Sequence, residues 1–106
     1  MRGPFPLNFS RVDILVIPGR PGVYGIANTA DSPVYIARAE NDLSLSLRRW
    51  VDKYKFFWFE YALSPKDAYL MECEAFHKSP DKRLENKLHP GPPDNLKLKC
   101  PVCGGT

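Results

Sequence analysis

The chain has 106 residues, the length of one small domain, with 43% hydrophobic and 25% charged residues, which are ordinary proportions for a globular protein. Its net charge of +3 permits a polyanionic partner but is too small to establish one. No apolar run approaches the roughly 18 residues of a membrane span, and the first residues lack the apolar core of a signal peptide, so we expect a single cytoplasmic domain over residues 1–106 with no membrane association.

The first third of the sequence predicts an irregular segment followed by a β-hairpin. Prolines punctuate residues 1–21 and leave one short apolar run, residues 12–17, so little regular structure is expected there. Residues 23–27 and 34–37 are rich in aromatic and β-branched side chains, which is typical of strands. The polar turn between these two runs predicts that they pair antiparallel.

A helix, a strand and a second helix are predicted next. Asp42 supplies a helix start, and apolar residues follow at helical spacing up to Tyr54. Residues 56–63 are nearly all aromatic or apolar, so they predict a third strand in the centre of the sheet. Ser64 caps the second helix, which should end near Pro80. Together these elements predict an α/β fold, a small three-stranded, mostly antiparallel sheet flanked by helices.

The second helix carries a glutamate on its apolar side. On a helical wheel Glu72 lies about 40° from Ala68, inside the stripe that also contains Met71 and Ala75. A carboxylate directed at a core must be paired, protonated or bound to a metal, because burying an uncompensated charge is costly. A buried salt bridge with an arginine and a metal site are therefore the alternatives for Glu72.

Two short motifs on the predicted hairpin lead to a family resemblance. Gly-Val-Tyr at residues 22–24, followed after ten residues by Tyr-Ile-Ala at residues 35–37, resembles the signature of the GIY-YIG nuclease family. The order of the following elements is also similar, since a helix and an aromatic strand precede the helix that carries Glu72. The resemblance covers residues 21–86, the expected core, and leaves a proline-rich tail at residues 87–106.

The resemblance implies a metal-dependent endonuclease that hydrolyses DNA phosphodiester bonds. It assigns Glu72 as the ligand of Mg²⁺ or Mn²⁺, and a carboxylate with open water positions suits such an ion. Tyr24 would be the general base or would orient the attacking water, and Tyr35 would donate a hydrogen bond near the phosphate. Asn86 resembles an asparagine that follows the glutamate helix in many members.

One departure from the family pattern concerns its arginine. Ser46 occupies the position of the arginine on the first helix, and Arg48 and Arg49 project about 60° or more away from it. Arg38, directly after the second strand, is a candidate replacement, and Ala37 takes the place of the second-motif glycine. We therefore expect a nuclease of low activity. The alternative is a catalytically inactive module of the same fold that binds nucleic acid or a protein partner.

The C-terminus predicts a second site. Cys100 and Cys103 form a C-x-x-C motif followed by glycine, the pattern of a zinc knuckle. Cys73 and His77 lie four apart on the second helix and would complete a structural Zn²⁺ site that staples the tail to the domain. His89 competes for the fourth position, and a terminal redox dithiol is the alternative to zinc. A third interpretation of the chain follows, a small zinc-binding interaction protein whose tyrosines only fill the core.

Partners are less well defined by the sequence. Basic residues gather around the first helix and in residues 78–99, where they could contact phosphates, but acids are interleaved with them. DNA is the expected partner from the resemblance, and double-strand cleavage by so small a nuclease would require a protein partner or a homodimer. The sequence leaves open the choice between DNA and RNA, the cleavage specificity and the oligomeric state.

Overall fold

A computed structural model describes residues 1–78. Asn86, His89, Cys100 and Cys103 lie outside the described residues, so the roles expected of them and of the tail remain predictions.

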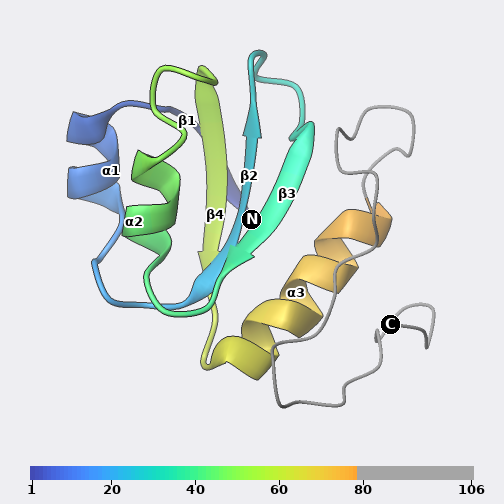
Figure 1. The fold of residues 1–106 in the computed structure, drawn as a ribbon. Helices are drawn as coiled ribbons and strands as arrows, with labels where there is room; N and C mark the ends of the chain where they lie inside the picture. The colour runs from blue at the N-terminus through green and yellow to red at the C-terminus, as the bar shows by residue number, and fades with distance from the viewer. Residues whose placement is uncertain (79–106) are drawn as a thin grey trace.

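Four strands form one antiparallel sheet, and helices cover both of its faces (Figure 1). The predicted α/β class is confirmed. The sheet order is β1-β4-β2-β3. Helices α1 and α2 pack on one face and α3 packs against β2 and β3 on the other. The elements in chain order are β1 (Arg2–Pro6), α1 (Phe9–Leu15), β2 (Gly22–Ala27), β3 (Tyr35–Ala39), α2 (Leu43–Arg48), β4 (Phe56–Tyr61) and α3 (Pro65–Lys78).

The predicted hairpin and the predicted central strand are both confirmed. Strands β2 and β3 pair antiparallel, with Tyr24 opposite Ala37. Strand β4 lies between β1 and β2, where Phe57, Trp58 and Phe59 are buried. The aromatic content of this strand predicted its place because large apolar side chains on both faces of a strand need cover on both faces.

The expectation of an irregular N-terminal segment is wrong, and the sheet has four strands rather than three. Strand β1 adds antiparallel to the outer side of β4, an edge position that tolerates proline because one side of the strand needs no ladder hydrogen bonds. Helix α1 follows, with Asn8 as its cap accepting a 2.8 Å hydrogen bond from the backbone N–H of Arg11. A five-residue edge strand and a seven-residue helix are too short for their periodicity to stand out.

The two predicted helix starts are confirmed. Asp42 caps α2 by accepting a hydrogen bond from the backbone N–H of Leu45 at 3.1 Å. At α3, the backbone N–H of Asp67 donates to Ser64 Oγ at 3.1 Å, and the Asp67 carboxylate accepts from the backbone N–H of Leu63 at 2.8 Å. Within residues 1–78, no helix has both the length and the apolar character needed to cross a membrane.

Helix α2 is shorter than its apolar spacing predicted. It ends at Arg48, although apolar residues continue at helical spacing up to Tyr54. Asp52 adopts a left-handed backbone with φ of 72°, which a continuing helix does not permit. The segment from Arg49 to Lys55 therefore turns back toward the start of β4, and this turn helps to build the site described next.

Candidate functional site

The candidate site lies at the β3 edge of the sheet, where its two covered faces meet. Tyr24 is opposite Ala37 and packs with the core under α2, whereas the neighbouring residue Val23 is opposite Arg38. Because successive side chains of a strand alternate between faces, Tyr24 and Arg38 start on opposite sides of the sheet. The long side chain of Arg38 nevertheless lines the same pocket as Tyr24 and also reaches Glu72 on α3.

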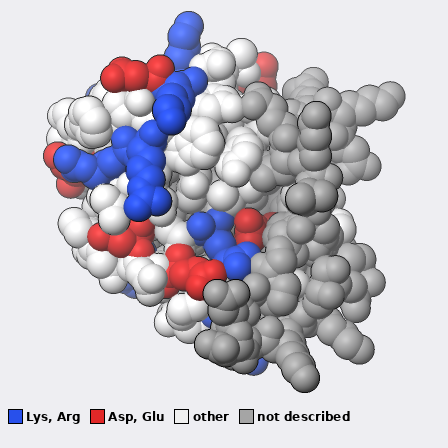
Figure 2. Space-filling view, viewed as in Figure 1, with Lys and Arg blue, Asp and Glu red and all other residues white. Residues whose placement is uncertain are grey.

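The pocket beside Tyr24, called here the Tyr24 pocket, has a volume of about 380 Å³. Its lining combines three cationic side chains with two hydroxyl groups and an indole. These residues are Tyr24, Arg38, Ser46, Arg49, Trp50 and Lys53. In the space-filling view, Lys and Arg side chains form a band over this face of the molecule (Figure 2). No carboxylate lies among the lining residues, so the charges of Arg49 and Lys53 suit an anion.

The hydroxyl of Tyr24 is held by its neighbours. It accepts a 3.0 Å hydrogen bond from Trp50 Nε1, and Trp50 in turn contacts the Tyr35 ring with centroids 5.1 Å apart. Burial raises the pKa of Tyr24, and the nearby Tyr35 and Glu72 raise it further, while the hydrogen bond from Trp50 and the charge of Arg49 oppose these effects. Tyr24 is therefore a neutral phenol at pH 7, oriented by Trp50.

Glu72 is buried on α3 and paired with Arg38. Its residue is 7% exposed, and its Oε1 accepts a 2.7 Å hydrogen bond from Arg38 Nη1. The same guanidinium donates through Nε and Nη2 to Glu40 Oε2, at 3.1 and 3.0 Å. Burial alone would lower the pKa of Arg38, but its hydrogen bonds to Glu72 and Glu40 outweigh burial and raise it. Arg38 is thus a permanently charged bridge between two carboxylates.

The structure brings together four of the residues singled out from the sequence: Tyr24, Tyr35, Arg38 and Glu72. The predicted burial of Glu72 is confirmed, and the salt bridge that was one alternative for it is present. Whether these residues act in catalysis remains a prediction.

Sequence reasoning counted Arg49 and Lys53 only among the basic residues around the first helix and did not place them in the site. The helical wheel put Arg49 about 60° from Ser46, yet Arg49 lines the Tyr24 pocket with Lys53. Arg48 takes another direction, forming an ion pair with Asp13 and lying 5.2 Å from the Phe9 ring centre. Arg49 keeps helical backbone angles as the C-cap of α2, and it lies three positions after Ser46, so the two residues share one side of the helix.

The carboxylates that could hold a divalent cation in this site are both bonded to Arg38. Glu72 and Glu40 converge on one guanidinium, so the fold already places two carboxylates around a positive charge. One or two carboxylates with water and phosphate oxygens are the usual ligands of Mg²⁺. Among residues 1–78 there is no group of three or more His, Cys, Asp or Glu that could hold a metal by itself. A divalent ion at Glu72 would therefore depend on water and on the phosphate of a ligand.

Two ligands of the predicted zinc site lie on α3. Cys73 is fully buried beside Tyr69. His77 is half-buried in the last turn of the helix. Since Cys100 and Cys103 are outside the described residues, the zinc site remains a prediction.

The raised pKa of Tyr24 predicts how stability depends on alkaline pH. An unfolded tyrosine loses its proton near pH 10, below the folded pKa of Tyr24, so the stabilisation is complete below about pH 10 and is lost as the pH rises through the folded value. The Tyr24→Phe variant lacks this group and should lose less stability between about pH 9 and 11. Urea denaturation across this range measures the difference, with Tyr61→Phe as a control that retains Tyr24. If the free energy of unfolding falls equally steeply with pH in the wild type and in Tyr24→Phe, the prediction is contradicted.

Comparisons with known proteins add no relatives. No protein-family model, curated protein or solved structure gives a significant match to the chain.

Proposed function

We propose that the protein is a metal-dependent endonuclease of GIY-YIG type that hydrolyses DNA phosphodiester bonds. The proposal rests on one observation, that a single side chain links Tyr24 to Glu72. Arg38 lines the Tyr24 pocket and is hydrogen-bonded to Glu72, so the tyrosine and the glutamate of the sequence resemblance belong to one connected site.

The pocket chemistry suits a phosphodiester. Arg38, Arg49 and Lys53 offer positive charge to the phosphate, and charge-assisted hydrogen bonds to phosphate are strong. Arg38 also supplies the cation that Ser46 cannot, opposite the negative charge that develops during hydrolysis. Because the pKa of Tyr24 is raised, this residue acts as a neutral hydroxyl that orients the attacking water rather than as a phenolate base.

Glu72, with Glu40 nearby, would hold the Mg²⁺ or Mn²⁺ ion. When bound, the ion supplies a Lewis acid for the phosphate oxygens. The contribution of the chain is to fix the Glu72 carboxylate beside the pocket, through the 2.7 Å hydrogen bond from Arg38, which lines that pocket.

Plasmid nicking with Mg²⁺ and then Mn²⁺ tests the proposal. Glu72→Gln and Tyr24→Phe should each reduce nicking by at least about 10²-fold, the cost of removing one well-placed polar group from such a site. Glu74→Gln is the matched control, since Glu74 is exposed two residues away on the same helix, and it should nick like the wild type. A folded wild type that does not nick, or nicking that both site variants retain, would overturn the enzyme proposal.

The inactive module that binds nucleic acid or a protein is the second candidate, and one observation favours it. Arg38 already compensates the charge of Glu72, and the two side chains are only 15% and 10% exposed, an arrangement that structural ion pairs also have. A protein of this kind would bind DNA with strong salt dependence and would nick with neither metal. The pairing of Glu72 with an arginine, largely closed to solvent, also favours the third interpretation, a small zinc-binding interaction protein whose tyrosines only fill the core, and such a protein would bind no DNA.

A further inference from the structure

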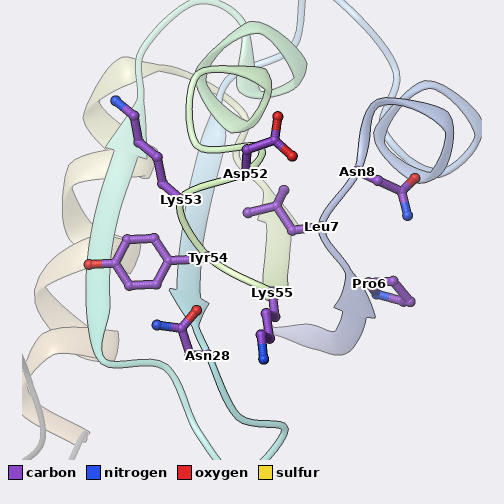
Figure 3. A pocket seen from close by; sticks show the side chains of 8 residues that line it. All are labelled: Pro6, Leu7, Asn8, Asn28, Asp52, Lys53, Tyr54 and Lys55. Carbon is purple, nitrogen blue, oxygen red and sulfur yellow. The ribbon is translucent and has the colours of Figure 1, made fainter.

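A second pocket, called here the Asn28 pocket, lies where three chain segments meet (Figure 3). It is formed by the end of β1, the end of β2 and the turn that leads into β4, and its volume is about 340 Å³. This volume is within the range of small-molecule sites, roughly 300–1,000 Å³. The polar residues that line it are Asn8, Asn28, Asp52, Lys53, Tyr54 and Lys55.

Backbone hydrogen bonds join the segments that form the Asn28 pocket. The N–H of Lys55 donates to the carbonyl of Ala27 at 3.1 Å, and the N–H of Leu7 donates to the carbonyl of Lys55 at 2.8 Å. These bonds tie the three segments together. The amide and ammonium groups of the pocket are therefore presented from a rigid frame rather than from free loops.

Lys53 lines both the Asn28 pocket and the Tyr24 pocket. The two pockets are therefore neighbours, and a chain-like ligand could pass from one to the other across Lys53. Arg49, Lys53 and Lys55 are all exposed along this path. The path has the charge that a nucleic-acid backbone requires.

We propose that the Asn28 pocket holds a nucleotide that flanks the phosphate bound in the Tyr24 pocket. The inference rests on the proposed function and extends it to a second substrate subsite. Lys53 and Lys55 would contact phosphates, and the amides of Asn8 and Asn28 would donate and accept hydrogen bonds at a base edge. Asn8 Oδ1 already accepts the N–H of Arg11, so Asn8 offers its NH₂ group to the ligand. Asp52 is the single acid in this lining, set against two lysines.

The test compares two lengths of single-stranded DNA, measured by fluorescence anisotropy without divalent metal. An octanucleotide can fill both pockets, whereas a dinucleotide can fill only the Tyr24 pocket. Lys55→Gln should weaken octanucleotide binding by roughly fivefold to tenfold and reduce the slope of log K against log salt by about 0.7, the value for one lost contact to a single strand. The Lys55→Gln variant should bind the dinucleotide as tightly as the wild type does. Lys66→Gln is the matched control, because Lys66 is an exposed lysine in the first turn of α3.

A second readout separates this inference from the proposed function. In amide NMR spectra, the side-chain NH₂ signal of Asn28 should shift on addition of the octanucleotide but not of the dinucleotide. If the octanucleotide binds but Lys55→Gln equals Lys66→Gln and the Asn28 signal does not move, the subsite is overturned and the nuclease proposal stands. If the wild type binds no octanucleotide, both are overturned.

Discussion

The Arg38→Met variant is expected to lose about 3 kcal/mol of unfolding free energy at neutral pH, because it leaves Glu72 buried without its cation. Glu40 adds to the cost, since the same guanidinium neutralises both carboxylates. Nicking should also fall by about 10²–10³-fold, because the cation of the Tyr24 pocket is lost. Arg38→Lys keeps the charge but cannot bridge two carboxylates through a planar fork, so its stability should be intermediate.

Urea denaturation at two pH values measures the effect of Arg38→Met. The stability deficit should shrink as the pH falls from about 7 to about 5, because a proton can replace the missing cation on a carboxylate and the folded variant gains more from that proton than the unfolded chain does. The double variant Arg38→Met/Glu72→Gln should recover most of the loss, since it contains no buried charge at α3. A deficit that is independent of pH and persists in the double variant would show that Arg38 acts through packing rather than charge.

Gly22→Ala is expected to destabilise the fold by about 3 kcal/mol or more, the upper range for overpacking a core position. Gly22 begins β2 and is opposite Tyr61 of β4. A Cβ there would overlap the carbonyl oxygen of Glu60 and would lie 2.9 Å from a methyl of Leu43. Because the obstacle is backbone in a paired strand, it cannot move without separating β2 from β4.

Thermal or urea denaturation of Gly22→Ala beside Gly25→Ala checks this reasoning. A Cβ on Gly25 would lie 2.6 Å from the Pro33 Cβ, but Pro33 belongs to the connection between β2 and β3 and can shift with it. We expect Gly25→Ala to cost about 1 kcal/mol, at the low end of overpacking. Equal losses in the two variants would indicate that the backbone of β4 yields more easily than its pairing implies.

The elements that the sequence predicted are those with strong local signals. The hairpin has its polar turn, β4 has its aromatic run, and α3 has the reciprocal cap of Ser64 and Asp67. Strand β1 has no such signal, because it becomes a strand only by pairing with the edge of β4. Tertiary pairing decides that segment, and a single sequence does not display it.

The candidate site, like the fold, was predicted only in part from the sequence. Helical spacing was enough to predict that Glu72 is buried, but its partner could not be derived from spacing. Arg38 contacts Glu72, 34 positions away, on the α3 face of the sheet, and its side chain also reaches the Tyr24 pocket beyond the sheet edge. Arg49 lines the Tyr24 pocket although the helical wheel put it about 60° from Ser46. Both facts depend on how far a long side chain reaches, which periodicity does not show.

The arrangement of the strands also bears on self-association. A sheet edge carries unpaired backbone groups that can recruit a strand from another molecule, and proteins oppose this with proline or with charge. In residues 1–78 the outer strands are β1 and β3. Strand β1 contains Pro4 and Pro6, and β3 carries Arg38 close to its end, held in place by Glu40. The side chain that unites Tyr24 with Glu72 therefore also places a fixed charge at an edge where aggregation would begin.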